Sequence, residues 1–231
     1  MEVRANTGNI LFNQVLVLPN KGERELLGKL TTYKYVKRAL DVVIASIALV
    51  ALFPIFLIIA ILIKAESKGP VFFAHKRIGK NGKEIKILKF RTMVDNAEDL
   101  IKEFTPEQME EFKKNFKLEN DPRITKMGKF LRKTSLDELP QLINIIRGEL
   151  SLIGPRPVIE AELEKYGNNK RKFLSITPGL TGYWAANGRS NVSYEERMIM
   201  ELYYIDNISW KLDLKIFFKT ILSVLKKEGA R

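Results

Sequence analysis

Two acidic residues stand side by side at positions 137 and 138, in the stretch SLDELPQ that covers residues 135–141. One explanation is a helix start, because Ser135 and Glu138 have the spacing of a capping box, in which each side chain accepts a backbone N–H. In that register Pro140 is the fifth helical residue and removes a hydrogen bond that the helix would otherwise make. A cap at Asp137 loses no bond, but it abolishes the pairing of Ser135 with Glu138. The other explanation is a pair of carboxylates held for chemistry, and local pattern alone leaves both open.

Positive charge surrounds this acidic pair in the sequence. Residues 122–134, PRITKMGKFLRKT, contain five Lys and Arg and no acid, and they lead straight into the pair. Nearby positive charge would depress the pKa of both carboxyl groups, and the cations could gather phosphates around a carboxylate that stays ionised. Arg156 stands between Pro155 and Pro157, which stiffen its loop and suit it to bidentate phosphate recognition. A solvated basic helix and an arginine that points at water are the simpler alternatives.

The composition limits the chemistry that this chain can perform. It has 231 residues, with 39 Lys and Arg against 27 Asp and Glu, for a formal charge of +12. This balance points to an anionic partner: nucleic acid, an anionic membrane surface or phosphorylated substrates. The absence of cysteine excludes disulfides and thiolate metal sites, and a single histidine, His75, argues against histidine metal sites and Ser-His catalysis. Carboxylates, Lys, Arg, hydroxyls or an oxygen-bound metal must therefore do the work.

Residues 42–63 form an uncharged apolar segment that belongs in a membrane. A straight helix of this length would just cross a bilayer core of about 30 Å. Pro54 lies near the middle and is expected to bend the helix. Both flanks are basic: Lys34, Lys37 and Arg38 precede the segment, and Lys64 and Lys68 follow it. Positive residues prefer the cytoplasmic side of a membrane, so both ends are expected to stay on that side. We therefore expect a re-entrant helix, break and helix over residues 34–68, although prolines also kink spanning helices and a buried soluble helix is the other alternative. Residues 1–33 are expected to form a short lead without a signal peptide.

The remainder, residues 69–231, is predicted to be a cytosolic domain of the α+β class that is mostly helical. Residues 71–78 and 84–90 are rich in β-branched and aromatic residues, and Asn81-Gly82 between them favours a hairpin turn. Thr105 and Gln108 match a capping box, and an apolar helix should follow the acidic pair and break at Gly148.

Two later segments have more than one interpretation. The Gly-rich loop 177–190 carries Tyr183, Trp184 and Arg189, which could stack a base or sugar, seat the domain in the headgroup layer or simply pack in the core. The stretch WKLDLKIFFKTILSVLKK, residues 210–227, forms a basic amphipathic helix. It could lie flat on an anionic membrane or pack on the domain, which is the commoner outcome.

From Tyr35 to Lys226 the chain closely resembles the bacterial sugar transferase family, the monotopic polyprenyl-phosphate phosphoglycosyl transferases. The resemblance is carried by long stretches in order: KRALDVVIASIALVALFPIFLIIAILIK, GPVFFAHKRIG, ILKFRTM, DPRITKMGKFLRKTSLDELPQLINIIRGELSLIGPRPV, TPGLTGYWAANGRS and YYIDNISWKLDLKIFFKTI. One departure is Phe53, which precedes Pro54 where some members have serine, so the bend would depend on the proline and the flanking charges.

The resemblance implies an enzyme that transfers a sugar 1-phosphate from a UDP-sugar to a polyprenyl (undecaprenyl) phosphate and releases UMP. This would be the first membrane step of exopolysaccharide, capsule, O-antigen or glycoprotein glycan assembly. The catalytic domain would lie on the cytoplasmic face of the inner membrane. The implied partners are membrane lipid, downstream glycosyltransferases and a second copy of the chain. Nucleic acid is not among the implied partners. The rivals are a membrane-tethered binding protein for anionic lipid or nucleic acid, whose binding would fall steeply with salt, and an inactive scaffold relative.

The resemblance also assigns roles to individual residues. Asp137 would be the nucleophile that forms a covalent phosphosugar–aspartate, and it would lie next to the Mg²⁺ that the family needs. Glu138 would assist the acceptor step as a base or hold the pair. Cationic side chains would bind substrate or acceptor phosphate; they are Lys89, Arg91, Arg132 and Arg156.

Overall fold

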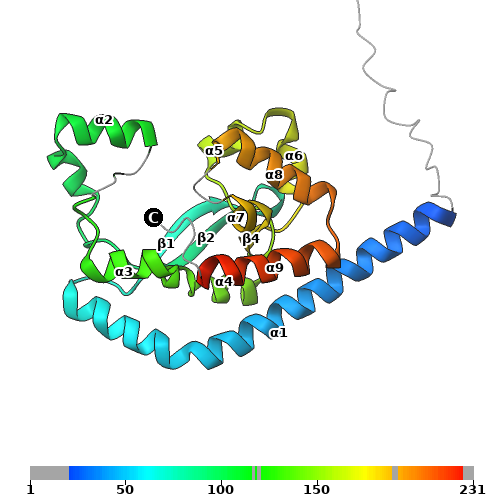
Figure 1. Ribbon diagram of the computed structural model, residues 1–231, viewed down its shortest axis with the longest axis horizontal. Helices are drawn as coiled ribbons and strands as arrows, with labels where there is room; N and C mark the ends of the chain where they lie inside the picture. The colour runs from blue at the N-terminus through cyan, green and yellow to red at the C-terminus, as the bar shows by residue number, and fades with distance from the viewer. Residues whose placement is uncertain (1–20, 116–117, 119–120, 189–191, 226–231) are drawn as a thin grey trace, which may run out of the picture. The chain divides into compact units, whose positions relative to one another are not determined.

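A computed structural model describes residues 21–115, 118, 121–188 and 192–225 (Figure 1). The chain divides into two units, Met1–Val36 and Lys37–Arg231. In the first unit the described residues are only the beginning of a helix. The predicted lead, residues 1–33, therefore falls largely outside the described residues. The second unit holds the core and every residue of the candidate site.

Helix α1, Lys21–Glu66, contains the whole predicted membrane segment. It begins before the predicted boundary at residue 34, and it continues through Pro54 where a break between two helices was predicted. Figure 1 shows that the helix curves instead. The continuity has a physical reason: Ala45, before the proline, and Phe56, after it, are both buried against the domain. Packing on both sides of Pro54 therefore supports the helix across the hydrogen bond that proline removes.

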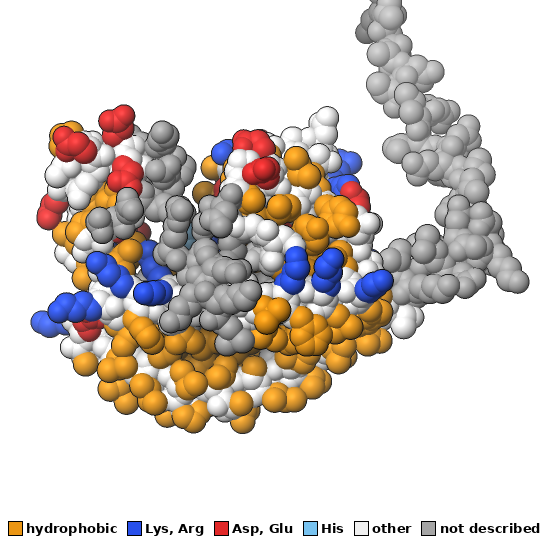
Figure 2. Space-filling model, in the orientation of Figure 1, with side chains coloured by type: hydrophobic (Ala, Val, Ile, Leu, Met, Phe, Trp, Pro, Cys, Tyr) orange, Lys and Arg blue, Asp and Glu red, His pale blue; other side chains and the backbone are white. Residues whose placement is uncertain are grey.

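Helix α1 is apolar on its outer side as well. Large apolar side chains there are 50–77% exposed; they are Ile47, Val50, Phe53, Leu57, Ile58 and Ile61. Among the described residues it is the one helix long and apolar enough to cross a membrane. Figure 2 shows hydrophobic side chains gathered over α1 and the neighbouring α9, with Lys and Arg along their border. An exposed apolar surface of this extent indicates a membrane contact.

The predicted hairpin is confirmed. Strand β1, Phe72–Ile78, pairs antiparallel with β2, Glu84–Phe90, in a register that joins Phe72 to Phe90 and Ile78 to Glu84. Between them lies a short 3-10 turn, η1 (Lys80–Gly82), in which Asn81 and Gly82 have φ angles of 57° and 78°. Asparagine and glycine adopt this left-handed region most readily, which is why the pair marks the turn. A second, smaller sheet joins β3, Ser151–Ile153, in parallel to β4, Gly179–Thr181.

The acidic pair lies between two helices, α3 (Lys126–Thr134) and α4 (Gln141–Arg147). The connection is a 3-10 turn, η3 (Leu136–Glu138), and Pro140 takes the N-cap position of α4. The predicted capping box is wrong, and so is a cap at Asp137. Ser135 adopts a left-handed conformation, φ 58°, that ends α3, and its side chain makes no capping hydrogen bond. The predicted helix end at Gly148 is confirmed, with φ 81°.

Shorter helices complete the domain. The segment before α3 holds η2 (Asp99–Glu103) and α2 (Pro106–Asn115), and the reciprocal hydrogen bonds of Thr105 and Gln108 confirm their capping box. After β3 come α5 (Glu160–Glu164), η4 (Gly167–Asn169) and α6 (Lys170–Leu174), and after β4 come α7 (Tyr183–Asn187), α8 (Tyr194–Asp206) and α9 (Trp210–Leu225).

Helix α9 combines the two alternatives that its sequence left open. Ile216 is buried in the domain, and Leu212 and Phe217 pack beside it. Ile221 and Leu222, further along the same helix, are exposed. Together with other exposed side chains they form a second apolar strip; the others are Trp210, Leu214 and Phe218. One face of α9 therefore packs on the domain while another is exposed, which is the dual pattern of an interfacial helix.

Candidate active site

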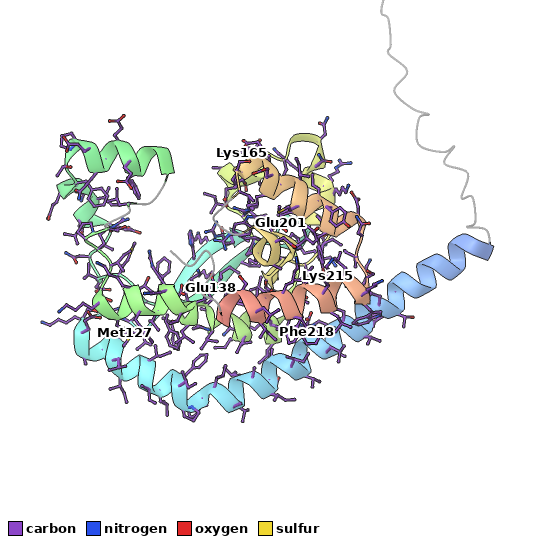
Figure 3. All side chains as sticks on the ribbon, viewed as in Figure 1. Met127, Glu138, Lys165, Glu201, Lys215 and Phe218 are labelled. Carbon is purple, nitrogen blue, oxygen red and sulfur yellow. The ribbon has the colours of Figure 1, made fainter. Side chains whose placement is uncertain are left out.

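Lys89 and the acidic pair form the centre of the candidate site. Lys89, near the end of β2, places its Nζ 2.7 Å from Oε1 of Glu138 and 3.6 Å from Oδ2 of Asp137. Asp137 is only 8% exposed, whereas the Glu138 side chain is more open to solvent. Figure 3 labels Glu138 where the hairpin and the α3–α4 segment meet. The adjacent acids of the sequence thus share one cation that comes from the hairpin.

The buried position of Asp137 changes its acidity. Burial raises the pKa of this carboxyl group, and the neighbouring charge of Glu138 raises it further, while Lys89 and Arg132 oppose the rise. The sequence predicted a depressed pKa from the run of positive charge, and this prediction is wrong for Asp137. Desolvation outweighs the cations, because the side chain is removed from water more fully than a surface acid would be.

Ser135 sets the direction in which the pair points. Its left-handed backbone turns the chain sharply at the end of α3, and its N–H donates back to the carbonyls of Leu131 and Arg132. A non-glycine residue in this conformation is uncommon and is often found at functional sites. The turn lets Leu136 and Leu139 pack on α1 while Asp137 and Glu138 between them face Lys89.

Two arginines of the predicted phosphate set come from neighbouring elements. Nε of Arg132, in α3, donates to Oγ1 of Thr92 at 3.0 Å; burial lowers the pKa of this guanidinium, and the charge of Asp137 opposes the shift. Arg91 follows β2, and its guanidinium donates to the carbonyls of Ser67 and Lys68. Arg91 therefore holds the chain just after α1, while Arg132 stands next to the acidic pair.

Arg156 is fixed through its backbone and its side chain. Its N–H donates to Oε1 of Glu201 at 3.1 Å, and its guanidinium lies 5.6 Å from the ring centre of Trp184. Arg197 lies over the same ring at 4.8 Å. A guanidinium stacked on an indole keeps its N–H groups available at the ring edge. The rigid presentation predicted from the two prolines is thus reinforced by the Trp184 and Glu201 side chains.

Glu201 is a site residue that the sequence pattern did not reveal. It lies in α8, is 1% exposed and is labelled in Figure 3. Among the described residues its Oε2 has no hydrogen-bond partner. Burial raises its pKa to about 7, against the opposing N–H of Arg156 and the charges of Arg197 and Arg156. A sequence signal was present, because an acid stands among apolar residues in MIMELYY, where α8 faces the core.

All six predicted site residues of the domain line one cleft of about 1130 Å³; they are Lys89, Arg91, Arg132, Asp137, Glu138 and Arg156. A smaller hollow adjoins it and shares several lining residues with it, among them Lys89, Glu138, Arg156 and Trp184. Glu201 and Arg77 line this hollow but not the cleft. Arg189 lies outside the described residues, and Pro54 lies in α1. The cleft therefore joins a carboxylate pair to four cationic side chains, an arrangement that can bind and attack a phosphate group.

The side chains present fit a magnesium ion. Among the described residues there is no group of three or more His, Cys, Asp and Glu that could hold a metal by themselves. Mg²⁺ does not need one, since it commonly binds one or two carboxylates together with substrate phosphates and water. Asp137 and Glu138 supply two adjacent carboxylates, and the raised pKa of Asp137 shows that Lys89 and Arg132 do not fully compensate its burial.

Comparison with known proteins assigns the chain to a family. The family model for "Bacterial sugar transferase" matches residues 32–227, which include most of α1, the residues that line the cleft and all of α9. The chain belongs to this family, and the resemblance noted from the sequence motifs is confirmed. It is therefore a transferase with a long apolar N-terminal helix and an α+β domain.

Individual relatives show how the family is used. The exopolysaccharide production protein ExoY of Sinorhizobium fredii is 49% identical over 197 residues, which are 84% of this chain and 87% of that protein. The undecaprenyl-phosphate galactose phosphotransferase of Salmonella typhimurium is 40% identical over 85% of this chain, which spans only 42% of that protein. An N-acetylgalactosaminephosphotransferase of Aeromonas hydrophila that acts on undecaprenyl phosphate is 36% identical over 86% of this chain and 46% of its own length.

The pKa of Glu201 predicts a pH-dependent stability. The carboxyl group has a pKa of about 7 in the folded protein and about 4.5 in the unfolded chain. The contribution of Glu201 to the free energy of unfolding is therefore full below about pH 4.5 and is lost as the pH rises through 7. Glu201→Gln removes this loss, so its melting temperature should rise relative to the parent between about pH 5 and pH 8. Thermal unfolding in detergent measures the difference. Glu84→Gln, on the exposed hairpin, is the control, and parallel curves for Glu201→Gln and the parent would contradict the assignment.

Proposed function

We propose that this protein is a phosphoglycosyl transferase that moves a sugar 1-phosphate from a UDP-sugar to undecaprenyl phosphate and releases UMP. The observation that carries the proposal is the partly buried acidic pair, set among Lys89, Arg132 and Arg156 in one cleft. Relatives named as phosphotransferases for undecaprenyl phosphate support the acceptor. The ExoY relatives support a place in exopolysaccharide assembly, as its first membrane step.

In the first step an oxygen of Asp137 attacks the phosphorus that bears the sugar. The bond between this phosphorus and the bridging oxygen of the pyrophosphate breaks, and UMP leaves with the bonding electrons. The product is a mixed anhydride of Asp137 and the sugar phosphate. Lys89, Arg132 and Arg156 offset the negative charge that the carboxylate meets at the pyrophosphate. A covalent intermediate lets a soluble donor and a lipid acceptor use the cleft in turn.

In the second step a phosphate oxygen of the acceptor attacks the same phosphorus. The bond to Asp137 breaks, the carboxylate is regenerated, and a polyprenyl diphosphate sugar is formed. Glu138 is placed to take the proton of the acceptor phosphate, since it lies beside Asp137 and is more open to solvent. The relatives are named for galactose and for N-acetylgalactosamine, so the family accommodates different sugars.

Replacing the nucleophile should stop the first step. Asp137→Asn keeps the size of the side chain but cannot form the anhydride, so UMP release from UDP-sugars should fall to background and the phosphosugar adduct on the intact protein should vanish. A coupled UMP assay with a panel of UDP-sugars and mass spectrometry of the protein measure both. Glu84→Gln is the matched surface control. Full activity of Asp137→Asn would overturn the mechanism.

We also propose Mg²⁺ as the cofactor, which Asp137 would hold together with the donor phosphates. When bound, the ion supplies positive charge that relieves the repulsion between the carboxylate and the pyrophosphate.

Removal of divalent ions should stop UMP release, and added Mg²⁺ should restore it. Dialysis against EDTA followed by titration with MgCl₂ in the UMP assay tests this expectation. The thermal unfolding curve of the dialysed protein serves as a control for lost structure. A rate that stays unchanged in excess chelator would remove the metal from the proposal.

The contacts of α1 support a re-entrant position in the cytoplasmic membrane, with the catalytic domain on the cytoplasmic face. Before the apolar segment, Nζ of Lys37 lies 2.7 Å from Oδ2 of Asp213 in α9. After it, the carbonyls of Ser67 and Lys68 accept hydrogen bonds from Arg91. Both ends of the segment thus touch the same domain. A spanning helix would put its ends on opposite sides of the bilayer, whereas a helix that enters and leaves one leaflet keeps them together.

The chain has no cysteine, which makes the topology directly testable. Single cysteines are introduced by Thr32→Cys before the segment, Lys68→Cys after it and Glu84→Cys in the hairpin. In inverted membrane vesicles, whose cytoplasmic face is outside, an impermeant maleimide should label all three. In intact spheroplasts it should label none. Labelling of Thr32→Cys from the opposite side to Lys68→Cys would show a spanning helix and refute the re-entrant arrangement.

A further inference from the structure

The N-terminus of α3 is closed by a carboxylate from the end of α1. Oε1 and Oε2 of Glu66 accept the backbone N–H groups of Lys126 and Met127 at 2.7 and 2.9 Å. Thr125 accepts the next N–H, from Gly128, through its side chain. Figure 3 labels Met127 above the end of α1. A helix start leaves four N–H groups without helical partners, and Glu66 supplies two of the acceptors, with a negative charge that suits the positive end of the helix dipole.

The C-terminus of α4 is closed by a cation from the other end of the apolar part of α1. The guanidinium of Arg38 donates to the carbonyl of Ile145 at 2.6 Å and to that of Ile146 at 3.0 Å. These carbonyls lie in the last turn of α4, where the helix leaves its acceptors unpaired and its dipole is negative. Arg38 and Glu66 therefore contact opposite ends of the α3–η3–α4 segment, residues 126–147, which carries the acidic pair.

Apolar packing fills the space between these two contacts. Leu136 and Leu139, on either side of the acidic pair, pack in one cluster with Phe56 and Ile63 of α1. Leu142 and Ile145 of α4 pack in a second cluster with Ala45 of α1. The segment that carries Asp137 and Glu138 thus lies directly on the inner face of the helix whose outer face is exposed and apolar.

We propose that Glu66 and Arg38 are positioning residues that fix the acidic pair to the membrane helix and thereby set its height above the bilayer. This inference rests on the proposed function, because it concerns the lipid acceptor. The phosphate of a membrane-bound acceptor is confined to the surface plane and cannot follow a displaced nucleophile. A soluble donor is not confined in this way and can follow the displaced nucleophile. A displacement of about 1 Å is enough to slow an oriented reaction strongly, so the contacts govern the second step more than the first.

The test compares a membrane-bound acceptor with a soluble one. Glu66→Gln and Arg38→Gln are assayed in liposomes with undecaprenyl phosphate and, separately, with a short water-soluble prenyl phosphate. The variants should lose about tenfold or more with the liposomal acceptor, while UMP release in a single turnover and transfer to the soluble acceptor stay near the parent rate. The phosphosugar adduct on Asp137 should accumulate. Arg38→Lys, which keeps a donor for the carbonyls, should recover most of the transfer.

Controls separate positioning from general loss of structure. Glu84→Gln and Arg147→Gln change an exposed acid of the hairpin and an exposed arginine in the last turn of α4, and neither should distinguish the two acceptors. Hydrogen exchange should speed up at the amides of Lys126 and Met127 in Glu66→Gln. Equal losses with both acceptors, or no loss with either, would overturn the inference. A parent protein that releases no UMP from any UDP-sugar would instead overturn the proposed function and the inference with it.

Discussion

The packing of the catalytic segment on the inner face of α1 is the contact on which the rest of the structure depends. Helix α1 is apolar on two sides, and only one side can be covered by the domain. Burying Ala45, Phe56 and Ile63 beneath the α3–α4 segment leaves the outer side for lipid. The candidate reaction centre therefore lies on one side of α1 and the exposed apolar surface on the other, an arrangement that suits the lipid-bound phosphate acceptor of the proposed function.

Buried charge is the second constraint, and part of it lies in the cleft and the adjoining hollow. Arg91, Asp137, Arg197 and Glu201 are all at most 8% exposed. A buried charge is costly unless neighbours compensate it, and here the compensation is incomplete, as the raised pKa values of Asp137 and Glu201 show. Incomplete pairing is unfavourable for folding. In the proposed function, a bound cation would offset the negative charge of Asp137 that its neighbours leave uncompensated.

Local signals predicted the parts of the fold that depend on neighbouring residues alone. Asn81-Gly82 identified the hairpin because only a few residue types accept its left-handed turn. The left-handed Ser135 and the continuity of α1 through Pro54 could not be predicted, since tertiary packing imposes both. The six predicted cleft residues were found from their types and from the family motifs, and the structure brings them together. The raised pKa of Asp137 escaped prediction because burial is a property of the whole fold, whereas charge can be counted in the sequence.

The geometry of the acidic pair explains how two adjacent carboxylates can take different roles. In a 3-10 turn, successive side chains diverge by about 120°, yet both acids reach the same ammonium group. Lys89 is 2.7 Å from Glu138 and 3.6 Å from Asp137, so the closer ion pair belongs to the more exposed acid. Asp137 is buried and held less closely, and its carboxylate is therefore the one that an incoming phosphorus can meet without first breaking a short ion pair. In the proposed reaction Glu138 stays with Lys89 while Asp137 forms the covalent bond, and the division of labour follows from one lysine placed nearer to one acid than to the other.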